Sequence, residues 1–159
     1  MNDRAISNEQ IIAFERQEAA YWSDYFKAAN PEIIRKLGVQ FFQVGSGSVT
    51  IASKVDILAF NRVIALGIGE PATESQIDEI IAIYKKAKVP RFFIQLSPNA
   101  QPARLSDLLQ EKGLKYYNNW VKWYQELDSF PKMNTDLRIE QIDRNSADIF
   151  ADIIITSFE

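Results

Sequence analysis

Two glycines and an alanine in the middle of the chain have the spacing of a phosphate-binding loop. Gly67, Gly69 and Ala72 follow an apolar stretch and precede a helical pattern, and together they read G-x-G-x-x-A. This pattern is typical of loops that hold a dinucleotide pyrophosphate against a helix N-terminus, because glycines let backbone amides approach the phosphate. Gly67 and Gly69 are therefore candidate cofactor-binding residues.

The acidic residues around this loop argue against a dinucleotide. Four carboxylates and no base lie near the predicted phosphate position: Glu70, Glu74, Asp78 and Glu79. An anion there would be repelled. Residues 95–97 also lack the acidic residue that holds a ribose hydroxyl about 20 residues further along a dinucleotide fold. The simpler interpretation is that the glycines make a tight turn and the acids favour the positive end of the helix.

A second set of candidates is the aromatic stretch after Gly113. Residues 114–127, LKYYNNWVKWYQEL, predict a long strand with aromatic residues on both faces: Tyr116, Tyr117, Trp120, Trp123 and Tyr124. A tyrosine hydroxyl can donate a proton in catalysis, so Tyr116 and Tyr117 are the candidate catalytic residues. The same side chains could instead pack in a core or line a ligand cleft, and the sequence leaves these alternatives open.

Composition excludes several classes of function. The chain of 159 residues has no cysteine and no histidine, which rules out thiol nucleophiles, disulfides, cysteine or histidine zinc sites and Ser-His-Asp triads. Acids on the first helical segment could bind an amine or a hard metal ion, but a solvated helix face explains them more simply, so we expect no metal: Glu9, Glu15, Glu18 and Asp24.

Charge and hydropathy limit the partners and the location. The formal net charge is −3, which lacks the basic surplus that nucleic-acid binding requires. The N-terminal residues are polar, and no apolar stretch reaches the roughly 18 residues of a membrane span. We therefore expect a soluble cytoplasmic protein that binds neither nucleic acid nor membrane.

The order of the predicted elements indicates an α/β (α+β) fold. Helical periodicity covers residues 7–29, and Asn30-Pro31 begins a short helix that Gly38 ends. The remaining elements of the first domain are strands at 39–44, 49–55 and 61–67, a helix from Thr73 to about Lys88, a strand at 91–97, a helix at 103–112 and the strand at 114–127. This order predicts a mixed, mostly antiparallel sheet flanked by helices.

The last 32 residues predict a change of domain. Residues 128–136 are polar and contain a proline, which is typical of a linker. Residues 137–143 alternate like a strand, and Asn145 or Ser146 can cap a helix that continues to Glu159. We therefore expect a first domain over 1–127, a linker over 128–136, and over 137–159 the opening strand and helix of a truncated second domain.

The chain resembles the GNAT family of acyl-CoA-dependent N-acetyltransferases. The resemblance rests on VIALGIGEPATESQIDEIIAIY, RFFIQL and LLQEKGLKYYNNWVKWY, while LRIEQIDRNSADIFADIIITSFE looks like the opening of a second such domain. It implies a three-layer GNAT-like fold, acetyl-CoA as the cofactor of the family and an amine as the acetyl acceptor. It also implies that this chain is the N-terminal half of a tandem-GNAT protein.

Both parts of the family's site are altered in this sequence. The family holds coenzyme A with a Q/R-x-x-G-x-G/A loop, and if Gly67 and Gly69 take the glycine positions, Ile64 stands where glutamine or arginine is expected. Leu109 occupies the position of the tyrosine that often donates a proton in the family motif L-Y-E-K-x-G-F. The resemblance therefore implies a degenerate half that is inactive alone and binds no acetyl-CoA, with catalysis in the C-terminal half.

Two kinds of partner are expected. The resemblance implies contact with the protein's own C-terminal GNAT domain, and a homodimer would also cover the apolar stripe of the last helix: Ile149, Phe150, Ile153, Ile154 and Phe158. The alternative function is a non-enzymatic module that binds a ligand or a protein on the same scaffold.

Overall fold

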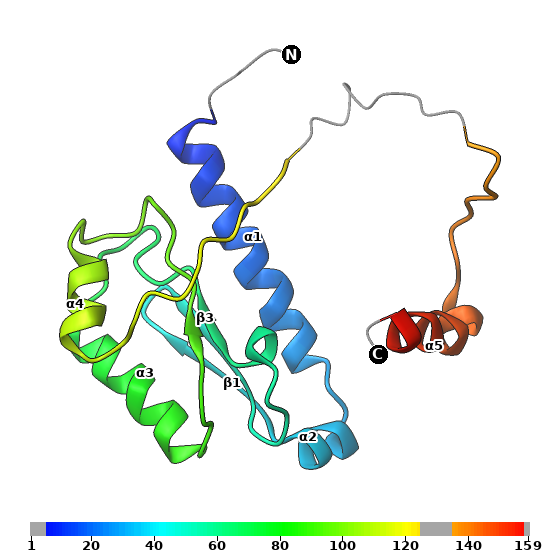
Figure 1. The fold of residues 1–159 in the computed structure, drawn as a ribbon, viewed down its shortest axis with the longest axis horizontal. Coiled ribbons are helices and arrows are strands. Elements are labelled where there is room, and N and C mark those ends of the chain that lie inside the picture. The colour runs from blue at the N-terminus through cyan, green and yellow to red at the C-terminus, as the bar shows by residue number, and fades with distance from the viewer. Residues whose placement is uncertain (1–5, 125–134, 158–159) are drawn as a thin grey trace. The chain divides into compact units, whose positions relative to one another are not determined.

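The computed structural model describes residues 6–124 and 135–157 (Figure 1). These residues belong to two compact units, Met1–Asn118 and Asn119–Glu159. The described part of the chain contains five α-helices and one four-stranded mixed sheet, which makes the protein α+β. In the described ranges, no helix is both long and apolar enough to cross a membrane.

The first unit holds four of the helices and the whole sheet. In chain order its elements are α1 (Asn8–Lys27), α2 (Pro31–Leu37), β1 (Val39–Val44), β2 (Gly47–Ala52), β3 (Arg62–Ile64), α3 (Glu74–Lys86), β4 (Phe93–Ile94) and α4 (Leu105–Glu111). The second unit contains α5 (Ala147–Ser157), which follows a single 3-10 turn.

The sheet has the order β1-β2-β3-β4 and combines two kinds of pairing. β1 pairs antiparallel with β2 across a turn that contains Gly45, and β2 pairs antiparallel with β3. β3 and β4 are parallel, and α3 makes the crossover between them. The prediction of a mixed, mostly antiparallel sheet flanked by helices is therefore confirmed at this level.

Local sequence signals fix the helix ends. Thr73 and Gln76 form the predicted capping box of α3, in which each side chain accepts a hydrogen bond from the other residue's backbone amide. The Asn30 side chain caps α2, and Gly38 ends that helix at a φ of 68°, where a side chain would be strained. These interactions lie within four residues of one another in sequence, which is why the sequence alone predicts them.

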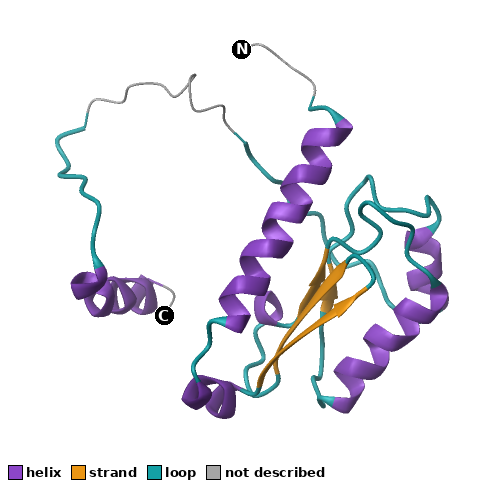
Figure 2. Ribbon diagram, turned by 180° about the vertical axis from the view of Figure 1, so that it is seen from behind, coloured by secondary structure: helices purple, strands orange, loops and turns teal. Residues whose placement is uncertain are grey.

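Helices α1 and α3 lie on opposite sides of the sheet (Figure 2). α3 buries Ile77, Ile80 and Tyr84 against its face. Since side chains alternate along a strand and Arg62 contacts α1, the neighbouring Val63 and its cross-strand partner Val49 face α3. The core cluster combines buried side chains of the sheet and α3 with three leucines of α4 and Ala19 of α1.

The long strand predicted over 114–127 is wrong for the part that the structure describes. Residues 114–124 contain neither helix nor strand, and 125–127 lie outside the described residues. A strand is stable only when its backbone pairs with another strand. β4 contains only Phe93 and Ile94, so the edge that would pair with this segment offers few backbone groups.

The strand predicted over 137–143 is also wrong, because these residues form no ladder. The helix after it is confirmed, but its 3-10 turn is capped by Asp143, whose carboxylate accepts a hydrogen bond from the Asn145 amide, instead of by Asn145 or Ser146. Among the described residues, neither segment takes part in the pairing of β1 to β4. The proposed linker falls largely on residues outside the described ranges, and the division into 1–127 and 137–159 stays a prediction.

Candidate ligand-binding site

The glycine loop folds back on its own chain. Gly67, at a φ of 78°, donates its backbone N–H to Ser46 Oγ at 2.9 Å and accepts a hydrogen bond from the Gln101 N–H at 2.8 Å. A Cβ at this position would collide with the Gln101 carbonyl oxygen. The Gly67 amide therefore has a partner within the protein, and the glycine is needed because two backbone segments approach closely.

At the start of α3, several backbone amides also donate hydrogen bonds to groups of the chain itself. The Gln76 amide donates to Thr73 Oγ1 at 3.2 Å, and the Thr73 amide donates to Gln76 Oε1 at 2.9 Å. The Ala72 amide donates to the Gln101 carbonyl at 2.7 Å. Three backbone donors at this helix end, those of Ala72, Thr73 and Gln76, are therefore occupied by the chain itself.

The two candidate tyrosines lie away from this loop's packing. Tyr116 is 72% exposed and Tyr117 is 67% exposed, and the Tyr117 ring lies 5.1 Å from the Phe93 ring. Leu109, in the position of the family's tyrosine, is buried in the core. The atoms that a Cβ at Gly67 or Gly69 would meet first belong to Gln101, Leu105 and Arg16, and not to either tyrosine.

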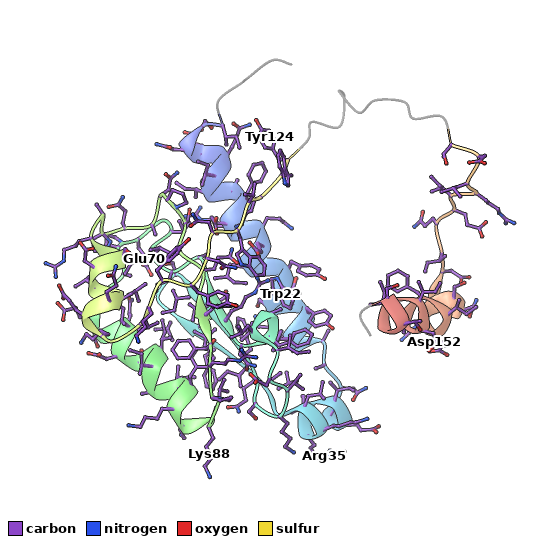
Figure 3. All side chains as sticks on the ribbon, in the orientation of Figure 1. Trp22, Arg35, Glu70, Lys88, Tyr124 and Asp152 are labelled. Atoms are coloured by element: carbon purple, nitrogen blue, oxygen red, sulfur yellow. The ribbon has the colours of Figure 1, made fainter. Side chains whose placement is uncertain are left out.

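Two hollows flank Gly69 and Glu70, at the carboxyl ends of the parallel strands β3 and β4. The larger, which we call the main hollow, has a volume of about 450 Å³ and lies among α1, the β1-β2 turn and the loop after β3. The smaller has a volume of about 330 Å³ and is lined by residues of the loop after β4 and of the start of α1. Ligands of open α/β sheets bind at this edge, which makes the loop a candidate site (Figure 3).

The main hollow is lined mostly by small and polar side chains. Helix α1 contributes Arg16, Ala20 and Ser23, and the loop after β3 contributes Glu70. The guanidinium of Arg16 lies over Gly69, where a Cβ would collide with it, and Gly69 has a φ of 86°. Arg16 and Gly69, which are 53 positions apart in the sequence, are therefore in close contact at the main hollow.

The β1-β2 turn supplies the hydroxyl and amide groups of the main hollow. Ser48 Oγ donates to Gln43 Oε1 at 3.3 Å, and Gln43 Nε2 donates to the Gly45 carbonyl at 3.0 Å. Ser46 Oγ accepts the Gly67 amide, so its own hydroxyl hydrogen can donate to a ligand. The polar groups of this wall are thus held in position before any ligand arrives.

A buried ionic network lies next to this site, between α1 and the sheet. Arg62 of β3, 5% exposed, lies 3.3 Å from Glu18 by its Nη2 and donates to Gln95 Oε1 at 3.2 Å by its Nη1. Gln95 Nε2 donates to the other oxygen of Glu18 at 2.8 Å, and the Arg62 guanidinium carbon lies 4.4 Å from the centre of the Trp22 ring. Burial lowers the pKa of Arg62, and the Glu18 carboxylate opposes that shift.

Arg62 is not among the residues predicted from the sequence, and the predicted solvated face holds for only some of the acids of α1. A solvated face describes Glu9 and Asp24, which are exposed, but Glu15 is buried and Glu18 is paired with Arg62. The one available signal was a base inside the otherwise apolar stretch RVIALG, since a buried base requires a buried acid. Within the described residues, no cluster of acids could hold a metal ion.

Comparisons of the chain with known protein families, with curated proteins and with solved structures find no match. The fold and the geometry of the site are therefore the grounds for assigning a function.

Proposed function

We propose that this chain is a non-catalytic domain of the GNAT type, the N-terminal half of a cytoplasmic protein whose C-terminal half transfers an acetyl group from acetyl-CoA to an amine. The observation that supports this proposal is the β3-α3-β4 crossover. It adds one parallel strand to an otherwise antiparallel sheet, after two helices and a hairpin. This is the order of elements that the resemblance implies.

The lack of catalysis in this half follows from the loop. Backbone donors at 67, 72, 73 and 76 have partners in the chain, and Ile64, in the place of a polar residue, is completely buried. Glu70 and Glu74 add negative charge where coenzyme A would bring its pyrophosphate. A cofactor that used these four donors would have to break internal hydrogen bonds in order to bind.

Calorimetric titration of the chain with acetyl-CoA tests the proposal that this N-terminal half does not bind the cofactor. We expect no binding tighter than about 10 μM, which corresponds to roughly −7 kcal/mol. A lower dissociation constant would mean that the loop opens and that this domain carries the cofactor.

The proposed acetyl transfer by the C-terminal half is tested on the protein encoded by the complete reading frame. We expect the reading frame to continue past Glu159, and we expect its protein to release free coenzyme A from acetyl-CoA when a primary amine is added. Tyr116→Phe and Tyr117→Phe should leave that rate within about twofold of the unaltered protein, because a general acid contributes on the order of 100-fold or more. A reading frame that stops at Glu159, or a longer product without transfer activity, contradicts the proposal.

The main hollow favours a second candidate function, a ligand-binding module on the same scaffold. It would operate without acetyl-CoA. Its residues lie on α1, on the β1-β2 turn and on the loop after β3, and binding of a ligand and binding of acetyl-CoA can be measured in separate titrations.

A further inference from the structure

Two opposite charges line the main hollow without neutralising each other. Arg16 and Glu70 are both exposed and both line it. Among the described residues, no hydrogen bond or ion pair joins either side chain to another group. Each therefore has its full capacity for a charged partner from solvent: the guanidinium as a donor and the carboxylate as an acceptor.

The structure holds the guanidinium where a ligand can reach it. Arg16 lies over Gly69, and only the absence of a side chain at Gly69 leaves that place open. A guanidinium is a planar fork that matches a carboxylate with two parallel hydrogen bonds. Glu70 lines the same hollow from the loop after β3, and a carboxylate suits an ammonium group.

The rest of the main hollow fits a small polar molecule. Ser23 and Ser46 present hydroxyls, while Ala19, Ala20 and Ala65 keep the walls short. A volume of about 450 Å³ lies in the lower part of the range found for small-molecule sites, which is roughly 300 to 1,000 Å³.

We propose that the main hollow binds a free α-amino acid, with its carboxylate on Arg16 and its ammonium on Glu70. A zwitterion satisfies both charges at once. A simple anion such as phosphate would gain from Arg16 but would be repelled by Glu70 on the same wall. The proposal does not depend on the acetyltransferase assignment, since neither residue takes part in the hydrogen bonds that close the glycine loop.

Calorimetry or ligand-observed NMR with the 159-residue chain tests this directly. The probes are the free L-amino acids, each titrated to about 10 mM, and we expect at least one to bind with a dissociation constant below about 1 mM. The N-acetyl and amide derivatives of that amino acid each lack one charge and should bind at least about tenfold more weakly. Inorganic phosphate and acetate should not bind measurably.

Matched variants locate the site. Arg16→Gln and Glu70→Gln should each weaken binding of the best amino acid by about tenfold or more, because each removes a charge-assisted hydrogen bond. Arg35→Gln on α2 and Glu79→Gln on α3 change the same charges outside the main hollow and should leave the affinity within about twofold. Ala20→Leu, at an exposed position of α1, fills the main hollow and should abolish binding without changing the thermal unfolding temperature by more than about 3 °C.

Three results would overturn the proposal. They are the absence of binding by every amino acid, unchanged binding in Arg16→Gln, and tighter binding of phosphate than of any amino acid. None of these bears on acetyl-CoA, whose own titration can fail or succeed independently.

Discussion

Helix α3 covers its face of the sheet with apolar side chains, whereas between α1 and the other face an ion pair, an amide and an aromatic ring lie beside buried apolar residues such as Phe26. Ile77, Ile80 and Tyr84 are buried on the first face, and Tyr84 stacks on Phe92 at 4.0 Å between ring centres. On the second face, Arg62 is held by Glu18, Gln95 and Trp22.

The difference indicates that the two faces of the sheet have different roles in the fold. Apolar burial is non-directional and stabilises any arrangement that excludes water, so the α3 face should supply most of the folding free energy. The Arg62 network is directional and specifies how α1 lies on the sheet. Since α1 also lines the main hollow with Arg16, Ala20 and Ser23, its position sets the shape of the candidate site.

The largest effect is expected on the α3 face. Ile80→Ala should lower the free energy of unfolding by about 3 to 4 kcal/mol, because it leaves a cavity at a position with no exposed surface. Urea denaturation measures the loss. Ile33→Ala on α2, where the side chain is partly exposed, serves as the control and should cost under about 1 kcal/mol. Equal losses of unfolding free energy at both positions would mean that the α3 face is not the main source of stability.

On the α1 face, the outcome should depend on whether one charge or both charges are replaced. Arg62→Ala should cost about 2 to 3 kcal/mol, since it removes the cation that pairs with Glu18 and the donor to Gln95 Oε1. Replacing both charges with apolar side chains, as in Arg62→Met combined with Glu18→Leu, removes the ion pair as a whole and should stay within about 1.5 kcal/mol of the unaltered protein. If this double variant is as unstable as the alanine variant, the network itself is a main source of stability.

Tyr84 combines both kinds of interaction, because it is apolar in its ring and polar at its tip. Its hydroxyl donates to the Thr50 carbonyl at 3.0 Å, so Tyr84→Phe should cost about 1 kcal/mol at pH 7. Burial raises the pKa of Tyr84, with Arg62 opposing the shift. The folded state therefore keeps the hydroxyl protonated at pH values where the unfolded chain ionises.

The pH dependence of this variant has a definite sign. Stability from a raised tyrosine pKa is complete below about pH 10, the unfolded value, and is lost as the pH rises above it. The advantage of the unaltered protein over Tyr84→Phe should therefore shrink between pH 9 and pH 11 in urea denaturation, by roughly 1.4 kcal/mol per pH unit at most above pH 10. A constant difference across this range would show that the hydroxyl also ionises in the folded state.

Features set by neighbours in sequence could be predicted. The capping box of Thr73 and Gln76, the Asn30 cap and the Gly38 stop need only a few residues each. The hairpin of β1 and β2 and the helical crossover to β4 follow from periodicity and turn residues.

Features set by distant residues could not be predicted. The pairing of Arg62 with Glu18 joins positions 44 residues apart, and the contact of Arg16 with Gly69 joins positions 53 apart. For residues 114–124 the sequence predicts a strand that the structure does not contain. Their residue types suit a strand, but a strand also requires a neighbouring strand with free backbone groups.

The smallest effect is expected in the aromatic segment that contains Trp120. If Trp120 were part of an interior strand, Trp120→Ala would lower the free energy of unfolding by about 3 kcal/mol or more. It is 59% exposed, so Trp120→Ala should cost under about 1 kcal/mol in urea denaturation. Trp22→Ala is the matched reference, because it removes the ring against which Arg62 lies, and it should cost at least about twice as much. A loss at Trp120 equal to that at Trp22 would mean that the segment is buried in solution, and that the comparison must include it as a third packed surface.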